Sequence, residues 1–264
     1  MGIRIVIAGI PVFLRTEDFN FAKLLKKRCQ YFCSSSGRVD SAIEIEIEFL
    51  KKYCRVHSAT TPKILVFYNK LEILHSNFHS EIDLRTNLGK LETDRNIFSL
   101  DSFLRILYSF LLLKNNGFLI HGTGILKRGE GYIFTGPTGS GKTTIARLSP
   151  LNSILSDEVV AVRNGIVYST PFWGEFQQGR GNLKGKTKEL FFLKHSRKFY
   201  IEKLSLAEGI KNLLRNALFF SKESECANRL IKICADLIKK IPCYNLYFYP
   251  TKLFWRKLSV LIRD

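Results

Sequence analysis

Residues 136–143 read GPTGSGKT, and this stretch decides how the rest of the chain is interpreted. It meets every fixed position of the pattern G-x-x-x-x-G-K-[ST], in which a glycine-rich loop wraps its backbone N–H groups around phosphate oxygens. Glycines have no side chains to block the approach of a phosphate. The flanking runs GYIFTG and KTTIARL predict the strand before the loop and the helix after it that this pattern requires. The sequence therefore predicts a phosphate-binding loop.

Each position of the loop has an expected role. Lys142 supplies a positive charge for the β and γ phosphates of a nucleotide, and the Thr143 hydroxyl is placed to hold Mg²⁺. The positive end of the helix that begins near Lys142 adds to the attraction for anions. ATP with Mg²⁺ is the expected ligand, although such a loop contacts phosphates and does not distinguish ATP from GTP. The residues expected to surround the nucleotide are Gly136, Pro137, Thr138, Gly139, Ser140, Gly141, Lys142, Thr143 and Thr144.

An acidic pair, Asp157 and Glu158, follows the apolar run SILS only fifteen residues after Lys142. A short helix ending at Ser149 and Pro150 would lead directly into a neighbouring strand and bring both carboxylates beside the loop. One carboxylate can ligate Mg²⁺, and the other can accept the proton of an attacking hydroxyl. Elsewhere such a pair is commonly a solvated strand end, and the nearby loop is what favours the catalytic interpretation.

The first hundred residues are expected to form mainly strands: IRIVIAGIPVF, AIEIEIEFL, KILVFYN and LEILHS. In the second run, Ile43, Ile45 and Ile47 alternate with glutamates, which is typical of a half-buried antiparallel strand with one wet face. Between the first strands, EDFNFAKLLKKRCQYF has the apolar spacing of a short helix.

The pattern changes at Ser99, where SLDSFLRILYSFLLLKNNG predicts a helix with Ser99 or Asp101 as its cap. We place a domain boundary just before it, which gives a β-rich N-terminal domain (residues 1–98) and an α/β catalytic domain with a helical C-terminal part (residues 99–264). In the second domain SILSDEVVAVR is expected to be one strand, followed by a turn and IVYST. The last third is expected to be mostly helical, with a closing strand YNLYFYP.

Composition limits the class of protein. With 45% apolar and 24% charged residues, the chain has ordinary globular composition. The longest apolar stretch, Phe103–Leu113, contains Arg105 and is too short to span a membrane. The N-terminal run IVIAGIPVF has no small-residue cleavage site, and the six cysteines form no C-x-x-C pair. We therefore expect reduced thiols and a cytoplasmic protein without a membrane partner.

The net charge of +18 is concentrated in residues 176–264, which carry 19 basic and 7 acidic residues. Such a field attracts acidic or phosphate-rich partners, although a solvated basic surface is equally compatible with it. No recognition motif for nucleic acid accompanies the charge, so nucleic acid is not the favoured partner. Arg180, Lys184 and Lys186 lie in the glycine-punctuated segment GEFQQGRGNLKGKTKEL, which we expect to be mobile. They are candidates to clamp an acidic peptide substrate or the transferring phosphoryl group, with a solvated loop as the alternative.

These motifs resemble the HPr kinase/phosphorylase family, which shares its nucleotide site with ATP-dependent phosphoenolpyruvate carboxykinase. The resemblance rests on His121 and Gly122 in IHGTGIL, on the loop, and on the acidic pair in LSDEVVAV. The chain looks still more similar to the HPr-kinase-like proteins associated with peptide-modification gene clusters, such as lasso-peptide precursor kinases. That likeness covers residues 99–264 and includes YSTPFWGE, ELFFLK, IEKLSLAEGIKNLLRNALF and IPCYNLYFYP.

The resemblance implies a P-loop kinase core and ATP-dependent phosphorylation of a Ser or Thr hydroxyl in a protein or peptide, a ribosomal precursor peptide being one candidate. It implies that Asp157 is the catalytic base, that Thr143, Asp157 and Glu158 hold the metal, and that His121 lies near the transferring phosphate. A structural hydrogen bond is the alternative role for His121. The family also suggests a homo-oligomer. Glu158 stands where the HPr-specific enzymes carry Asp, and their glycine-rich signature for the reverse reaction is not recognisable, which argues against HPr as the substrate.

Two other function classes stay open at this point. One is a binding module in which ATP orders residues 176–188 around a partner without any transfer. The other is an NTPase stimulated by nucleic acid, whose binding would weaken steeply with salt. A separate feature, the histidine pair His75 and His79, lies in a predicted strand-and-loop region without Cys or acidic ligands at metal spacing, and we interpret both as surface histidines.

Overall fold

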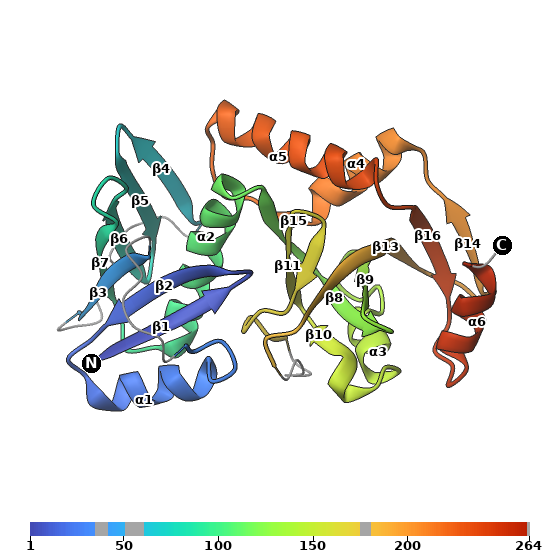
Figure 1. Ribbon diagram of the computed structural model, residues 1–264, viewed down its shortest axis with the longest axis horizontal. Coiled ribbons are helices and arrows are strands. Elements are labelled where there is room, and N and C mark those ends of the chain that lie inside the picture. Colours follow the sequence, from blue (N-terminus) through green and yellow to red (C-terminus); the bar gives the residue numbers. More distant parts are fainter. Residues whose placement is uncertain (35–41, 51–60, 175–180, 263–264) are drawn as a thin grey trace. The chain divides into compact units, whose positions relative to one another are not determined.

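The computed structural model describes residues 1–34, 42–50, 61–174 and 181–262 (Figure 1). Over these residues the chain is a mixed α/β protein with two mixed sheets and six α-helices, so the α/β class expected from the sequence is confirmed. The chain divides into two compact units. Unit 1 comprises Met1–Lys114 with Phe219–Asn228, and unit 2 comprises Asn115–Leu218 with Arg229–Asp264.

Unit 1 is built on a seven-stranded sheet with the order β1-β2-β3-β7-β6-β5-β4. Its strands are β1 (Gly2–Ile7), β2 (Ile10–Arg15), β3 (Ile43–Phe49), β4 (Lys63–Phe67), β5 (Lys70–His75), β6 (Phe78–Asp83) and β7 (Leu88–Thr93). The first apolar run, expected as one strand, is a β1–β2 hairpin that turns at Ala8 and Gly9, both at positive φ. Helix α1 (Phe19–Arg28) confirms the helix expected after it, and the Asp18 carboxylate caps it by accepting from the Phe21 N–H at 3.0 Å.

Strand β3 shows the expected alternation, because Ile43, Ile45 and Ile47 are buried while the glutamates between them are half-buried or exposed. Its expected antiparallel direction is wrong, since β3 is parallel to both β2 and β7. Alternation shows only that one face of a strand is buried. Direction depends on the connection, and here helix α1 carries the chain from β2 back to the start of β3, as a parallel pair requires.

Helix α2 (Ile97–Lys114) belongs to unit 1, and so does the later segment Phe219–Asn228. The expected boundary at 98/99 assigned nearly all of α2 and this segment to the second domain. The Tyr108 hydroxyl is fully buried and donates to the carbonyls of Ile5 and Ile10 at 3.0 and 3.1 Å. The helix also begins earlier than expected, and the Asn96 side chain accepts from the Phe98 N–H at 3.0 Å.

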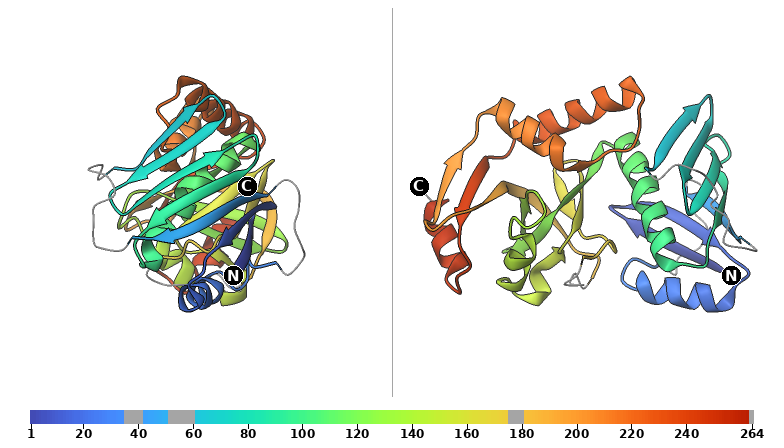
Figure 2. Two further views of the ribbon diagram at one scale, coloured as in Figure 1. Left: turned by 90° about the vertical axis from the view of Figure 1, so that its left-hand side faces the viewer. Right: turned by 180° about the vertical axis from the view of Figure 1, so that it is seen from behind.

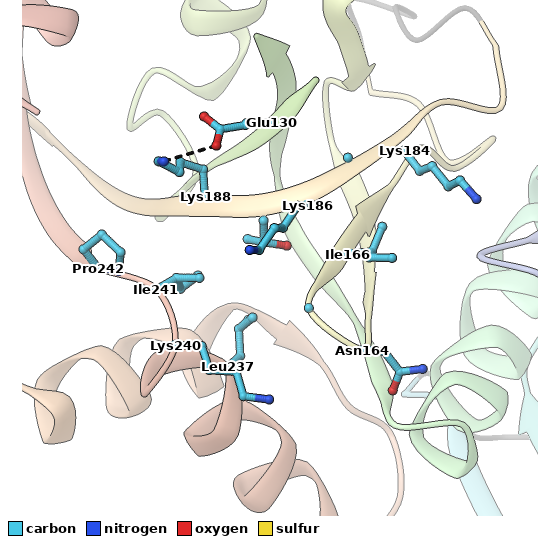
Figure 3. Close-up of a pocket in the computed structure, with 13 residues that line it drawn as sticks. Glu130, Asn164, Ile166, Lys184, Lys186, Lys188, Leu237, Lys240, Ile241 and Pro242 are labelled. Atoms are coloured by element: carbon cyan, nitrogen blue, oxygen red, sulfur yellow. Dashed lines mark hydrogen bonds and ion pairs between the residues drawn. The ribbon is translucent and has the colours of Figure 1, made fainter. Parts of the chain in front are cut away.

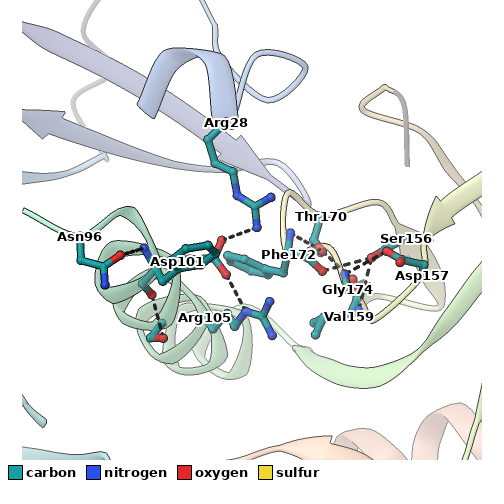
Figure 4. Close-up of polar contacts among 12 residues, drawn as sticks. Arg28, Asn96, Asp101, Arg105, Ser156, Asp157, Val159, Thr170, Phe172 and Gly174 are labelled. Carbon is teal, nitrogen blue, oxygen red and sulfur yellow. Dashed lines mark hydrogen bonds and ion pairs between the residues drawn. The ribbon is translucent and has the colours of Figure 1, made fainter. Parts of the chain in front are cut away.

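Asp101, expected as a possible cap, lies inside helix α2 and binds two arginines. Its carboxylate accepts from Arg28 at 3.1 Å and from Arg105 at 3.0 Å (Figure 4). The charged group therefore ties α2 to α1 within unit 1. Asp101 is not needed as a cap, because the Asn96 side chain already accepts from a backbone N–H at the start of the helix. Its carboxylate is therefore available for the ion pairs.

Unit 2 contains the nine-stranded sheet and the phosphate-binding motif. Strand β9 pairs with both β8 and β13, so β8, β11, β12, β13 and β9 form a closed ring of paired strands. The strands are β8 (Gly117–Lys127), β9 (Glu130–Thr135), β10 (Ile154–Ser156), β11 (Val159–Arg163), β12 (Ile166–Tyr168), β13 (Lys184–His195), β14 (Tyr200–Lys203), β15 (Ala217–Leu218) and β16 (Cys243–Phe248). The helices are α3 (Lys142–Arg147), a 3₁₀ turn (Leu151–Ser153), α4 (Leu206–Asn216), α5 (Ser224–Ile238) and α6 (Phe254–Leu261). The first residues of α5, up to Asn228, belong to unit 1.

Strand β13 corrects two expectations, because its first half lies in the segment expected to be mobile and it interrupts a region expected to be mostly helical. Lys184, Lys186 and Lys188 are exposed, whereas Gly185 and Thr187 between them are buried. This is the period-two pattern of a strand, in which lysines occupy the exposed face and small residues occupy the buried face. Arg180 lies outside the described residues.

The core beneath the phosphate-binding motif joins β9, β13 and β16 to helices α3 and α6. Figure 2 shows the ribbon from two further sides. Phe134 of β9 stacks on Phe191 of β13 with ring centroids 5.1 Å apart, and Ile145 of α3 lies in the same cluster. Burial of these side chains fixes α3 against the end of β9. Among the described helices of both units, none is both long and apolar enough to cross a membrane.

Candidate nucleotide site

The loop that joins β9 to α3 needs glycine at particular positions. Gly139 and Gly141 have φ values of +80° and +103°, which side chains of L-residues rarely adopt. A Cβ on Gly141 would lie 2.6 Å from Cζ of the Phe248 ring, and a Cβ on Gly136 would lie 2.8 Å from the Ser140 hydroxyl. The three glycines of the motif thus allow the loop to curl tightly over the end of the core.

The Lys142 side chain folds back across its own loop. Its ammonium group donates to the carbonyls of Gly136 at 2.8 Å and Pro137 at 2.9 Å. Burial lowers the pKa of Lys142, and the negative charge of Glu158 opposes that shift. The Lys142 ammonium group is therefore held at the loop by two neutral carbonyl groups, and the negative charge of Glu158 favours its charged form.

The acidic pair lies at a break between two strands. The run SILSDEVVAVR, expected as one strand, is split into β10 and β11, with Asp157 and Glu158 between them. The buried Ser156 hydroxyl shapes this break, because it accepts from the backbone N–H groups of Glu158 and Val159 and donates to the carbonyl of Phe172, each at 3.3 Å. The acidic pair therefore lies outside the paired residues of both strands.

The carboxylates of the pair are held against a glycine. Asp157 is only 3% exposed, and its Oδ1 accepts from the Gly174 N–H at 3.0 Å (Figure 4). A Cβ on Gly174 would lie 2.7 Å from Oε2 of Glu158 and 3.3 Å from Oδ2 of Asp157. The backbone at this glycine can therefore pass close to both groups, and it orients Asp157.

Thr123 joins the phosphate-binding motif to the acidic pair. This fully buried residue of β8 lies with its Oγ1 3.0 Å from the Lys142 carbonyl and 3.2 Å from the Asp157 carbonyl. A hydroxyl has one proton to donate, so the two carbonyls share it. The backbones of Lys142 and Asp157 thus approach each other across a single side chain, as the short spacing in the sequence predicts.

His121 lies two residues before Thr123 on the same strand. Side chains at positions i and i+2 of a strand point to the same face, so the half-buried His121 ring shares a face with the Thr123 hydroxyl. The His121 carbonyl accepts from the hydroxyl of Thr135, the residue just before the loop, at 2.6 Å. The neighbouring Gly122 N–H donates to the Glu158 carbonyl at 2.8 Å. The strand of His121 therefore pairs with β9, which leads into the loop, and with β10 and β11, which flank the acidic pair.

The two described basic candidates lie elsewhere in unit 2. Lys186 pairs with Glu130 at the start of β9, whereas the loop follows Thr135 at the end of that strand. Five residue steps of a strand cover about 17 Å. Lys184 is two residues farther along β13. The structure does not bring either lysine to the loop, while Thr143 and Thr144 lie half-buried in the first turn of α3.

The sequence did not reveal the contacts that His195, Ser156 and Thr123 make at the site. His195 places Nε2 2.6 Å from the Gly139 carbonyl, and its ring stacks over Phe248 with centroids 6.3 Å apart. No local signal predicts a contact between residues 56 positions apart in the chain. Thr123 could have been found, because the strand IHGTGIL places it on the same face as His121.

The structure also corrects the interpretation of His79. In unit 1 its Nε2 lies 2.9 Å from Oε1 of Glu72 and 3.8 Å from Oε1 of Glu81. One ligand atom from each of these residues lies within 4.8 Å of the others, so acidic groups do stand at metal-ligand distance from this histidine. The register of β5 and β6 creates this group, which the sequence spacing alone did not show.

Within the described residues, these contacts bring the backbones of the loop, Lys142, His121 and the acidic pair together in unit 2. Comparison of the chain with protein-family models gives no match, and comparison with curated proteins gives no significant match either.

Proposed function

We propose that this chain is a P-loop kinase that transfers the γ-phosphoryl group of Mg-ATP to a Ser or Thr hydroxyl of a protein or peptide, with a core of the HPr kinase/phosphoenolpyruvate carboxykinase type. The observation that carries the proposal is the pair of contacts made by Thr123, which hold the backbones of Lys142 and Asp157 side by side. Phosphoryl transfer depends on a cationic cradle for the phosphates and a carboxylate beside it. The site supplies both on a buried framework.

The residues of the loop fit a triphosphate. The Ser140 hydroxyl is buried and has no hydrogen-bond partner among the described residues, so it is available to donate to a phosphate oxygen. A Cβ at Gly139 would meet nothing within 4 Å, which leaves its backbone open to a ligand. The two carbonyls that hold Lys142 are groups that phosphate oxygens can replace, because a charged acceptor makes the stronger hydrogen bond to an ammonium group.

The acidic side of the site fits a hard cation. Thr143, Asp157 and Glu158 offer hydroxyl and carboxylate oxygens, the ligands that Mg²⁺ prefers. When bound with the nucleotide, Mg²⁺ would neutralise charge on the phosphate oxygens. The Gly174 N–H holds one oxygen of Asp157 in place, which fixes the direction in which this carboxylate faces the site.

In the proposed reaction Asp157 receives the proton of the acceptor hydroxyl. The hydroxyl oxygen forms the new bond to the γ phosphorus as the bond to the β,γ-bridging oxygen breaks, and ADP leaves with that electron pair. Lys142 orients the β and γ phosphates through its ammonium group. His121, on the same face of β8 as Thr123, is the candidate neighbour of the transferring phosphoryl group. Positioning and charge neutralisation account for most of the rate in such a site.

The experiment that tests the proposal uses an Asp157→Asn variant with Asp236→Asn as its matched control. The amide keeps an oxygen that accepts from Gly174 but is not a base, and Asp236 is an exposed carboxylate of α5 in the same unit. Mass spectrometry would follow phosphorylation of candidate Ser- and Thr-containing peptides with Mg-ATP, and calorimetry would follow nucleotide binding. We expect transfer to fall by about 10²- to 10⁴-fold in Asp157→Asn with nucleotide affinity retained.

Undiminished transfer by Asp157→Asn would contradict the assignment of Asp157 as the catalytic base. Partner binding that requires ATP, without any phosphorylated product, would instead favour the nucleotide-dependent binding module. ATP turnover that DNA or RNA stimulates, with binding that weakens steeply as salt rises, would favour the nucleic-acid-stimulated NTPase.

A further inference from the structure

A pocket of about 860 Å³ lies in unit 2 away from the candidate nucleotide site (Figure 3). Four lysines line it together with one carboxylate: Lys184, Lys186, Lys188, Lys240 and Glu130. The remaining lining includes the apolar residues Ile166, Leu237, Ile241 and Pro242. The pocket therefore combines a surplus of positive charge with an apolar surface.

The walls of the pocket are fixed by the fold. They come from the first half of β13, from the turn between β11 and β12, and from the end of α5 with the residues that follow it. The Thr187 N–H donates to the Gly165 carbonyl at 2.9 Å, and the Leu190 N–H donates to the Pro242 carbonyl at 3.2 Å. These backbone hydrogen bonds connect β13 to the other two walls. The cavity is thus a preformed feature, as ligand pockets usually are.

The positive charge in the pocket is only partly neutralised. The Lys188 ammonium donates to Oε1 of Glu130 at 3.1 Å, so the single carboxylate is already engaged. Over the part of the chain that the structure describes, Lys184, Lys186 and Lys240 form no ion pair within 4.0 Å. The pocket is therefore suited to an anionic ligand.

The lysines have a spacing that favours an extended peptide. Lys184 and Lys186 alternate with buried residues along β13, so they project from one face of the strand. The register of β13 against β9 shifts at Lys188, whose ammonium group bonds Glu130. Side chains two residues apart on a strand are separated by about 6.6 Å. An extended peptide has the same repeat, so carboxylates on alternate residues can meet successive lysines. Its intervening apolar side chains can contact Ile166 and Leu237.

We propose that this lysine pocket anchors an extended acidic segment of a polypeptide, at a distance from the site of phosphoryl transfer. That the anchored polypeptide is the phosphorylation substrate rests on the proposed kinase function. The pocket is about 17 Å from the loop along β9, so its lysines do not touch the reacting phosphoryl group. They recruit substrate by charge and leave the chemistry to Asp157 and Lys142.

The inference is tested by direct binding of a peptide to the full chain without nucleotide. The probe is a fluorescein-labelled Glu-Leu-Glu-Leu-Glu-Leu peptide, and the neutral comparison is Gln-Leu-Gln-Leu-Gln-Leu. Fluorescence anisotropy would be measured with the wild-type protein, with a Lys186→Gln/Lys240→Gln variant, and with a Lys203→Gln/Lys252→Gln control. The control removes the same charge from exposed lysines of unit 2 outside the pocket.

We expect the acidic peptide to bind the wild-type protein and the control alike, and to bind the pocket variant at least about 10-fold more weakly, since charge-assisted contacts would be lost. The neutral peptide should not bind. Equal binding by the pocket variant and the control, or no binding to the wild-type protein, would overturn the inference. Displacement of the peptide by a short thymidine oligonucleotide at equal charge concentration would also overturn it, because the ligand would then be nucleic acid.

This test is independent of the nucleotide site. Failure of Mg-ATP to bind, together with specific binding of the acidic peptide, would contradict the kinase proposal and support the peptide pocket. Binding of Mg-ATP without specific peptide binding would support the nucleotide site and contradict the peptide pocket.

Discussion

At the scale of single residues, Thr123 shows how a small hydroxyl can organise a site. It is fully buried, and its one proton is shared by two carbonyls that belong to segments 34 and 19 residues away in the chain. No charge is involved, so the contact places the backbones of Lys142 and Asp157 without disturbing their electrostatics. Thr123 acts through these two residues and is a positioning residue.

Replacement of Thr123 with the isosteric Val should therefore affect both stability and transfer. Two buried carbonyls lose their shared donor, so we expect the free energy of unfolding to fall by about 1–3 kcal/mol. Transfer should fall at least about tenfold, since small displacements of reacting groups are expensive in rate. The measurements are urea unfolding and the peptide phosphorylation assay.

The matched control is Ser80→Ala in unit 1, which removes a buried hydroxyl that donates to the Lys90 carbonyl at 2.8 Å. It should lower stability by a similar amount and leave the transfer rate per folded molecule unchanged. Wild-type transfer by folded Thr123→Val would show that the double contact has no positioning role.

Glu189 is a second residue whose environment has a measurable consequence. It is buried on β13, and burial raises its pKa from 4.5 to about 7, with the charge of Lys188 opposing the shift and that of Glu130 adding to it. Its Oε2 has no hydrogen-bond partner among the described residues. The folded state therefore favours the protonated carboxyl group.

Stability should fall as pH rises from about 4.5 to about 7, because over that window the folded state binds more protons than the unfolded state. Glu189→Gln keeps the neutral shape and removes this dependence. We expect the variant to gain roughly 1–3 kcal/mol over the wild type between pH 5 and pH 8, measured by urea unfolding at both values. An unchanged difference between the two proteins across this range would refute the assignment.

At the scale of elements, the loop and helix α3 are stabilised mainly by contacts with other elements of unit 2. Helix α3 has only six residues, and its N-cap is Gly141, which has no side chain to cap it. Phe248 lies beneath Gly141, and His195 contacts the carbonyl of Gly139. The conformation of the loop is thus set by β13 and β16 as well as by its own glycines.

Gly139 and Gly141 should respond differently to alanine. Both have positive φ, so each substitution adds about 1–2 kcal/mol of backbone strain. A Cβ at Gly139 would meet nothing within 4 Å, whereas a Cβ at Gly141 would meet the Phe248 ring at 2.6 Å. We expect Gly141→Ala to lose more stability and more nucleotide affinity than Gly139→Ala, measured by thermal unfolding and calorimetry.

The double variant Gly141→Ala/Phe248→Leu should recover part of that difference, because the smaller side chain removes the ring from the path of the new methyl group. Equal losses for the two single variants would contradict the role assigned to Phe248.

Local patterns predicted the elements whose signals are contained within one segment. Helix α1 and strand β9, the strand expected before the loop, belong to this class. So does the turn at Asn164 and Gly165, which have positive φ. In these cases capping groups, glycine and apolar spacing act over a few residues.

The misassigned elements depend on partners far away in the chain. The direction of β3 is set by its crossover connection, and the strand character of Lys184–Lys188 is stabilised by pairing with β9 and β12. For the site, the motif GPTGSGKT predicted the loop, and the short spacing from Lys142 to Asp157 predicted the acidic pair beside it. Neither signal revealed the ring of His195, because its contact with Gly139 exists only once the sheet has formed.

At the scale of the whole molecule, the candidate nucleotide site and the lysine pocket both belong to unit 2. Unit 2 also contains most of the basic C-terminal third of a chain whose net charge is +18. Such a charge attracts any polyanion at low salt, and its long-range part is screened at physiological ionic strength. Binding that depends on the loop itself must therefore be measured near 0.15 M salt, where nonspecific attraction is weak.

The most direct test of the proposed nucleotide site is a calorimetric titration of Mg-ATP into the wild-type protein, a Lys142→Met variant and a Lys203→Met control at that salt concentration. We predict saturable one-to-one binding to the wild type and the control. We also predict an affinity at least about tenfold lower for Lys142→Met, since a charge-assisted contact to the phosphates is lost. Absence of binding of both Mg-ATP and Mg-GTP to the folded wild-type protein, or equal affinity in Lys142→Met, would contradict the proposed site.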